Sequence, residues 1–346
     1  MNPKSQAKVD RIKDSPTKRL SDSNLLLTTN TVRAYSLKDK RWLSVSIPSI
    51  RLIKFSTSAF STLVLPPASK DLVLAFATSS TNATPASTSS DVIKDKGLGT
   101  VLLLSGPPGV GKTLTAESVA EAMRVPLYSL SAGDLGTNPK DVERVLTSTL
   151  QLAAKWRAMI LLDEADVFLL SRNNEHTDLE RNKLVSIFLR VLEYHSGFLF
   201  LTTNRMEDVD AAFESRIHLS LQYRELDGQA RRKIWANLLQ PSKHDGKSGE
   251  DSKTESDSDG WASLDPSTTG FTISDLDELA SYEMNGRQIK NAVRSARMLA
   301  ESRGAGGPGS EGGKAEEGKG EKFNIGHLRV VLKVREENRS AFEGKA

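Results

Sequence analysis

The stretch VLLLSGPPGVGKT (residues 101–113) decides the fold class of this chain. Its first five residues have the length and apolar character of a buried strand, and a helical stretch, 113–124, follows the glycines. Between them, Gly106–Thr113 matches the pattern G-x-x-x-x-G-K-[ST] in the strand–loop–helix context that this pattern requires. The sequence therefore predicts a P-loop, and an ordinary glycine-rich turn is the alternative.

The residue types in this segment suit the binding of a nucleotide triphosphate. Glycines let backbone N–H groups turn inward around phosphates, and the N-terminus of the following helix adds its dipole. Lys112 is expected to neutralise the β and γ oxygens, and the Thr113 hydroxyl to bind Mg²⁺. The expected binding set is continuous: Gly106, Pro107, Pro108, Gly109, Val110, Gly111, Lys112, Thr113 and Leu114.

A second apolar run, Met159–Leu162, leads directly into an acidic pair about fifty residues after the P-loop. Asp163, at the end of this expected strand, is placed to hold Mg²⁺ through water. Glu164 is placed to polarise the attacking water as a general base. The alternative is an acidic pair that caps a helix.

Three further polar residues are candidates for the same chemistry. Asn204 follows a third apolar run, 198–203, and is expected to hydrogen-bond the attacking water or the γ-phosphate. Arg216 is expected to act in trans as an arginine finger. Arg287, which opens a C-terminal helix, is expected to reach the γ-phosphate. The alternatives are an ordinary loop asparagine and two surface arginines.

Apolar runs and helical periods alternate through residues 91–224, which predicts a parallel sheet covered on both faces. The expected strands are 101–105, 126–131, 159–163 and 198–203, and the expected helices are 113–124, 140–156 and 178–194. Helices are also expected over 225–240, 272–302 and 325–342. The run Leu72–Ala77 has the length of a buried strand, and the low-complexity stretch 78–90 is typical of a flexible linker or a surface loop.

We therefore expect four regions along the chain. These are a disordered basic tail (1–31), a segment with short strands and a linker that precedes the core (32–90), a nucleotide-binding α/β subdomain (91–224), and a helical lid (225–346) with disordered insertions near 242–260 and 303–321.

Composition narrows the class further. The 346 residues are 38% hydrophobic and 26% charged, as in an ordinary globular protein, and the net charge is only +3. The absence of cysteine excludes disulfides and thiolate sites and fits an intracellular location in cytoplasm, nucleus or mitochondrion. No apolar run approaches the length of a membrane span. The basic N-terminus suits either a solvated tail or contact with nucleic acid or acidic lipid.

These motifs together resemble the AAA family of ATPases, in particular a fungal branch of AAA-core proteins. The stretches that carry the resemblance are DVIKDKGLGTVLLLSGPPGVGKTLTAESVAE, LYSLSAGDLG, ILLDEADVFL, LVSIFLRVLEYHSGFLFLTTNR, FESRIHLSLQY and NGRQIKNAVRSA, within residues 91–302. The resemblance implies a P-loop NTPase αβα sandwich with a five-stranded parallel sheet, followed by a small helical lid.

The resemblance also implies ATP and Mg²⁺ as cofactors, and ATP hydrolysis coupled to remodelling of a protein or protein-complex partner in a homo-oligomer, usually a hexamer. It makes Asn204 sensor 1, Arg216 the arginine finger and Arg287 sensor 2, and it places Val92 and Ile93 against adenine. Lys112 and Thr113 become the Walker A pair, and Asp163 and Glu164 the Walker B pair.

Two positions depart from the family pattern. Phe213 stands where many members have a second finger arginine, and the region 132–137 has no pore-loop aromatic, which argues against axial threading. Two other functions stay open at this stage. One is a nucleotide-gated scaffold or binding module with little turnover, and the other is an ATPase that remodels nucleic acid.

Overall fold

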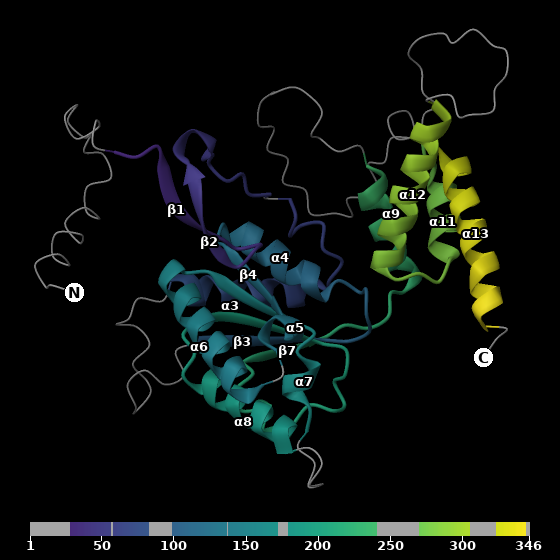
Figure 1. Cartoon of the computed structure of the whole chain (residues 1–346). Helices are drawn as coiled ribbons and strands as arrows, with labels where there is room; N and C mark the ends of the chain where they lie inside the picture. Colours follow the sequence, from purple (N-terminus) through teal and green to yellow (C-terminus); the bar gives the residue numbers. More distant parts are fainter. Residues whose placement is uncertain are drawn as a thin grey trace, which may run out of the picture. The chain divides into compact units, whose positions relative to one another are not determined.

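The computed structural model describes residues 28–56, 58–82, 99–136, 138–171, 179–240, 270–304 and 323–343 (Figure 1). The chain divides into two compact units, Met1–Lys54 and Phe55–Ala346. The expected segment 32–90 contributes residues to both units. The expected division into four regions remains a prediction.

The described part of the first unit is an antiparallel hairpin. Strands β1 (Thr31–Ser36) and β2 (Arg41–Ser46) pair, and one 3₁₀ turn, η1 (Ile47–Ser49), follows them. Tyr35 and Trp42 are cross-strand partners, and their rings meet edge to face at 5.4 Å. The short strands and helical turn expected after residue 32 are therefore present.

The second unit is built on a five-stranded parallel sheet, as expected. Its strands are β3 (Gly99–Ser105), β4 (Leu127–Ser131), β5 (Met159–Asp163), β6 (Gly197–Thr203) and β7 (Leu219–Gln222). Their order is β4-β5-β6-β3-β7. Strand β7 was not marked by an apolar run, because it is a short edge strand in which half-buried and exposed residues alternate.

Helices cover both faces of this sheet. On one face, α3 (Pro67–Asn82) and α4 (Lys112–Met123) pack on the central strands and share an apolar core with them. On the other face lie α6 (Pro139–Trp156) and α8 (Leu179–Glu193), which contact each other. Two short helices, α5 (Ala132–Leu135) and α7 (Asp166–Leu169), follow β4 and β5. The architecture is thus an αβα sandwich.

The sequence-based expectation for residues 72–82 was wrong. Leu72–Ala77 is not a strand, and residues 78–82 are not linker, because both belong to helix α3. Val73 and Ala77, four residues apart, are fully buried against the sheet, whereas Leu72 is 46% exposed. This spacing follows one face of a helix, and the run of apolar residues obscured it.

Among the described residues of the lid, four helices pack around an apolar core of their own. They are α9 (Gly228–Leu239), α11 (Ile273–Ser281), α12 (Gly286–Gly304) and α13 (Ile325–Glu343). Trp235, Phe271, Ile289 and Leu328 lie at the centre of that core. The stretch 272–302 is thus two helices. A break at residues 282–285 separates them, and Asn285 exchanges hydrogen bonds with Gln288 at the start of α12.

Several expectations fall outside the described residues. They concern Val92 and Ile93, and most of the tail and insertions expected at 1–31, 242–260 and 303–321. None of the described helices has the length and apolar character needed to cross a bilayer.

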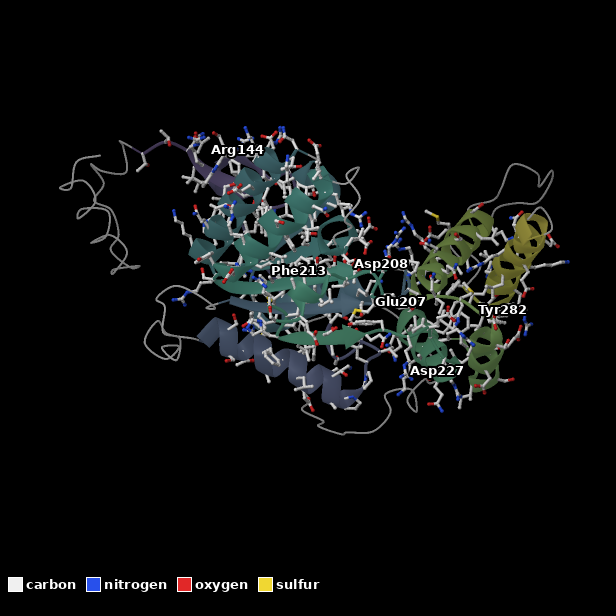
Figure 2. The ribbon with its side chains drawn as sticks, turned by 90° about the horizontal axis from the view of Figure 1, so that it is seen from below. Arg144, Glu207, Asp208, Phe213, Asp227 and Tyr282 are labelled. Atoms are coloured by element: carbon white, nitrogen blue, oxygen red, sulfur yellow. The ribbon has the colours of Figure 1, made fainter. Side chains whose placement is uncertain are left out.

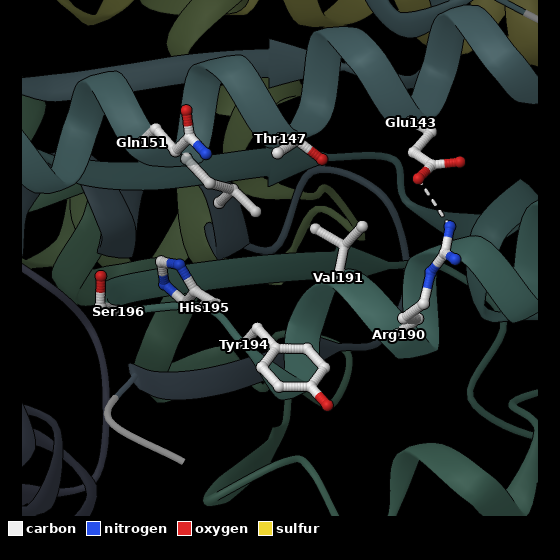
Figure 3. A pocket seen from close by; sticks show the side chains of 9 residues that line it. Glu143, Thr147, Gln151, Arg190, Val191, Tyr194, His195 and Ser196 are labelled. Atoms are coloured by element: carbon white, nitrogen blue, oxygen red, sulfur yellow. Dashed lines mark hydrogen bonds and ion pairs between the residues drawn. The ribbon is translucent and has the colours of Figure 1, made fainter. Parts of the chain in front are cut away.

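His195 fills the space at the amino-terminal ends of two central strands (Figure 3). Its side chain packs against Gly99, where a Cβ atom would lie 2.7 Å from the ring carbon Cδ2. The residue is 3% exposed, and neither ring nitrogen has a hydrogen-bond partner among the described residues. Burial lowers the pKa of His195 to about 4, so the folded protein holds a neutral imidazole there.

The buried strand β3 should contribute strongly to the stability of the second unit. Replacing Leu102, which is fully buried, by alanine should lower the free energy of unfolding by about 2–5 kcal/mol because it leaves a cavity. Urea unfolding followed by circular dichroism measures this. The matched variant Leu52→Ala, at a side chain that is 97% exposed, should change stability by less than about 0.5 kcal/mol. Equal effects of the two changes would contradict the assigned core.

His195 should make the fold sensitive to acid. Its folded pKa lies below the ordinary value of 6.5, so the unfolded chain binds a proton that the folded chain excludes. Stability should therefore fall as the pH drops from about 6.5 towards 4. The loss should reach about 2 kcal/mol at pH 5. In His195→Leu, the decrease in the free energy of unfolding between pH 7 and pH 5 should be smaller than in the wild type by about 2 kcal/mol. Urea unfolding at each pH measures this decrease. Tyr194→Phe should show the same decrease as the wild type. A His195→Leu profile parallel to the wild type would refute this origin.

Candidate active site

The P-loop joins β3 to α4 through residues 106–111 in a conformation that only glycine adopts easily. Gly106, Gly109 and Gly111 have φ values of 137°, 79° and 110°. A Cβ atom on Gly106 would also lie 2.2 Å from the carbonyl oxygen of Tyr223. The loop ends at Lys112, where α4 begins, so the first amides of a 12-residue helix face the site.

Lys112 folds back over this loop. Its Nζ donates hydrogen bonds to the carbonyl oxygens of Gly106 (2.6 Å) and Pro107 (2.8 Å), and to Oδ1 of Asn204 (2.8 Å). Burial lowers the pKa of Lys112, and the nearby Asp163 and Asp166 oppose that effect. The structure thus places an ammonium group between the P-loop and the end of β6.

The two expected metal ligands are in direct contact. The Thr113 hydroxyl lies 3.1 Å from both carboxylate oxygens of Asp163, and Thr202 Oγ1 also donates to Asp163. Hydroxyl and carboxylate oxygens are what Mg²⁺ prefers. No cluster of three or more acidic, histidine or cysteine side chains stands ready for a metal in the described part of the chain. The donor set therefore fits an ion that phosphate and water oxygens coordinate as well.

Glu164 has a strained backbone at the end of β5. Its φ is 54°, in the left-handed region that costs a residue with a Cβ about 1–2 kcal/mol. Two bonds to Thr202 hold it there: Glu164 N donates to Oγ1 (2.9 Å), and Ala165 N donates to the carbonyl oxygen (2.8 Å). The side chain is exposed and lines the pocket that the P-loop opens into.

A further acidic residue positions Asn204. Asp166 Oδ1 accepts hydrogen bonds from the Asn204 backbone N–H (3.0 Å) and from the Thr203 hydroxyl. Asp166, Thr202 and Thr203 were not predicted from the sequence as site residues. Two signals could have marked them: β6 ends in two successive threonines directly before Asn204, and Asp166 stands three positions after Asp163.

Residues 108–113 of the P-loop, together with Asp163, Glu164, Thr202 and Asn204, line a pocket of about 390 Å³. Its remaining walls come from distant segments that the sequence analysis did not select, namely residues 62–65 before α3 and the lid residues Ile234, Asn237, Leu238 and Lys290. Asn237 Nδ2 donates to the Thr62 carbonyl oxygen at 3.0 Å and so joins these two walls. Leu63, Val64 and Leu65 add an apolar surface beside the polar P-loop, as an aromatic base requires.

The lid meets the P-loop through the start of α12. Arg287 N lies 3.4 Å from the Gly109 carbonyl oxygen, and Asn285 Nδ2 lies 3.4 Å from that of Pro108. The side chain of Arg287 lines the pocket, and its charge contributes to lowering the pKa of Lys112. Burial raises the pKa of Glu117 in the same pocket, and Lys290 opposes that rise.

Among the expected site residues that the structure describes, three do not line this pocket. The carbonyl oxygens of Gly106 and Pro107 accept hydrogen bonds from Lys112, which does line it, whereas Arg216 lies elsewhere. Its guanidinium donates to the carbonyl oxygens of Leu189 (3.2 Å) and Ala212 (2.9 Å), and pairs with Glu193 at 3.4 Å. Phe213, which precedes it by three residues, is fully buried beside Phe188 (Figure 2). Arg216 therefore belongs to the α8 side of the sandwich.

A second depression, of about 290 Å³, lies between α6 and α8 (Figure 3). A Glu143–Arg190 ion pair of 2.6 Å stands on one side, and the ring of Tyr194 on another. None of the expected nucleotide-site residues line it.

Comparison with known proteins agrees with this geometry. Residues 102–224 match the ATPase family associated with various cellular activities (AAA), and residues 226–341 match the fungal AAA+ ATPase lid domain.

Three relatives illustrate the similarity. Human ATPase family AAA domain-containing protein 3B is 31% identical over 134 residues, which are 38% of this chain and 21% of the relative. Spastin of Dictyostelium discoideum is 26% identical over 189 residues, 53% of this chain and 28% of the relative. Fidgetin-like protein 1 of Drosophila melanogaster is 31% identical over 155 residues, which are 41% of this chain and 29% of the relative. The chain thus spans less than a third of the length of these relatives. It belongs to the AAA family of ATPases and carries a lid of the fungal AAA+ type.

Proposed function

We propose that this protein binds ATP with Mg²⁺ in the 390 Å³ pocket, hydrolyses it, and uses the turnover to remodel a protein or protein-complex partner as a ring-shaped homo-oligomer. The observation that carries the proposal is the cluster of Lys112, Thr113, Asp163, Glu164 and Asn204 at one edge of the sheet. Family membership and relatives named spastin and fidgetin-like protein support the remodelling class.

The residues divide the work of phosphoryl transfer. Backbone N–H groups of the P-loop and the first turn of α4 hold the phosphates, and the Lys112 ammonium turns from the carbonyls of Gly106 and Pro107 to neutralise them. Bound Mg²⁺ supplies charge neutralisation of the phosphate oxygens, and Thr113 and Asp163 are the residues that hold it. Leu63, Val64 and Leu65 cover the base. Val92 and Ile93 remain a proposal for the same role.

Glu164 and Asn204 act on the attacking water. The exposed Glu164 carboxylate, which lines the pocket, accepts its proton. Asn204 is held by Asp166 and orients the water, and Arg287 stabilises charge on the γ-phosphate from the lid side.

Substitutions should separate binding from chemistry. Lys112→Ala should abolish tight ATP binding because the phosphates lose their cation. Glu164→Gln should bind ATP as the wild type does and lose turnover by about a hundredfold or more, since only the base is removed. Phosphate release and equilibrium binding of a fluorescent ATP analogue measure the two effects. Glu143→Gln, at a carboxylate outside the pocket, should leave both unchanged. Equal phosphate release from all four proteins would sink the proposal.

Arg216 should act on the nucleotide of a neighbouring protomer. Arg216→Ala alone should lose turnover by roughly a thousandfold because the transferring phosphoryl loses its cation. Mixing it with Lys112→Ala protomers should restore activity, since each then supplies what the other lacks. Glu193→Gln, which removes the ion pair and keeps Arg216, should stay active. An unrecovered mixture, or a fully active Arg216→Ala protein, would show that the finger is misassigned.

A further inference from the structure

Tyr223 lies where the sheet ends and the connection to the lid begins. It follows β7 directly, and α9 of the lid begins five residues later, at Gly228. Its backbone N–H donates to the Ser105 carbonyl oxygen at 2.7 Å, which fixes it beside the last residue of β3. Tyr223 therefore lies at the end of the edge strand, at the start of the connection to the lid, and beside the P-loop.

The backbone of Tyr223 passes against the first glycine of the P-loop. A Cβ atom on Gly106 would lie 2.2 Å from the Tyr223 carbonyl oxygen and 2.9 Å from its Cβ atom. Distances this short leave no room for any side chain on Gly106. The start of the P-loop is thus shaped around Tyr223.

The side chain of Tyr223 reaches the other end of the same loop. Its hydroxyl lies 2.7 Å from Thr115 Oγ1, and Thr115 Oγ1 lies 3.1 Å from the Gly111 carbonyl oxygen. The carbonyl can only accept, so the single Thr115 hydroxyl proton goes to Gly111, and Tyr223 must donate to Thr115. The direction of the chain is Tyr223 to Thr115 to Gly111.

This hydrogen-bond chain is shielded from water. Tyr223 is 8% exposed and Thr115 is 1% exposed. Burial raises the pKa of Tyr223 to about 12, so the hydroxyl remains a proton donor at neutral pH. Buried chains of this kind are stronger than their exposed equivalents, and breaking one leaves an unpaired polar group.

The connection from Tyr223 to the lid is short and fastened at its far end. Arg231 of α9 donates to the carbonyl oxygen of Leu226 (2.8 Å) and to that of Ala280 on α11 (2.9 Å). Only residues 224 and 225 separate Tyr223 from Leu226, whose carbonyl oxygen accepts the hydrogen bond from Arg231. Tyr223 is therefore joined by a short stretch of backbone to α9, which lines the nucleotide pocket with Ile234 and Leu238.

We propose that Tyr223 is a positioning residue that couples the P-loop to the lid through its hydrogen bond to Thr115. Nucleotide binding fixes the conformation of the P-loop. Because Tyr223 is hydrogen-bonded to Thr115, its position follows that of the loop, and residues 224–227 transmit the change in position to α9. This inference rests on the proposed function and deepens it, because it names the element that links the occupied site to the lid.

The test compares Tyr223→Phe, Thr115→Val and the double variant in the full-length protein, by titration with a fluorescent ATP analogue and Mg²⁺. Each single change should raise the Kd of the analogue about three- to tenfold, and the double variant should be no weaker than either single one, since all remove the same bond. Thr115→Ser keeps the hydroxyl and should restore most of the affinity lost in Thr115→Val. Tyr128→Phe, at a buried tyrosine on β4, is the matched control.

Hydrogen exchange supplies a readout that a purely structural role would not move. In the wild type, the analogue should slow exchange in both α4 and α9. In Tyr223→Phe the slowing should persist in α4 and be lost in α9. A Tyr223→Phe affinity within twofold of the wild type, additive effects in the double variant, or unchanged protection of α9 would each overturn the inference. Binding and exchange require no hydrolysis, so a wild type that binds without turnover would refute the proposed function and leave this test intact.

Discussion

The site depends on one geometric constraint, which is that parallel strands bring all their carboxyl ends to the same edge of the sheet. Strands β5, β6 and β3 are neighbours, so the segments that follow them are neighbours too. Hydrogen bonds across these segments keep them together: Gly106 N donates to the Thr203 carbonyl oxygen, and Ala165 N donates to that of Thr202. The P-loop, the acidic pair and Asn204 meet because of strand order, although about a hundred residues separate the first from the last.

Hydrogen bonds at the carboxyl-terminal edge of the sheet stabilise a strained backbone and hold the site residues in place. Strain at Glu164 is offset by two hydrogen bonds to Thr202, and the same threonine also donates to Asp163. Asp166 in turn holds the strand end and Asn204 together. These hydrogen bonds fix the positions of Asp163 and of the Asn204 backbone relative to each other, as preorganised electrostatic catalysis requires. Rigidity is supplied by residues that do not themselves touch a reacting atom.

The parts of the structure that the sequence predicted are those that leave a local pattern. Central strands buried on two faces give continuous apolar runs, and the P-loop and the acidic pair each occupy contiguous positions. The edge strand β7 and the helix α3 were not predicted. In β7, half-buried and exposed residues alternate, and in α3 a block of apolar residues hides the helical period. Residues 62–65 and Lys290 reach the pocket only through folding, so no neighbour in the sequence marks them. Arg216 is the opposite case: a local motif selects it, but its described contacts lie on the α8 side.

The lid has an apolar core that is separate from that of the sheet. In the proposed ATPase, this separation bears on the exchange of one nucleotide for another. The apolar residues of the lid pack among themselves, and the sheet with α3 and α4 has its own cluster. At the start of α12, the bonds to the P-loop are two contacts of 3.4 Å, which is long for hydrogen bonds. A swing of the lid away from the P-loop would break these two contacts and the 3.0 Å hydrogen bond from Asn237 to the Thr62 carbonyl oxygen, and it would leave both cores intact. In the proposed ATPase, departure of spent nucleotide would then need no unfolding of either core, and single substitutions at these polar contacts would change its rate.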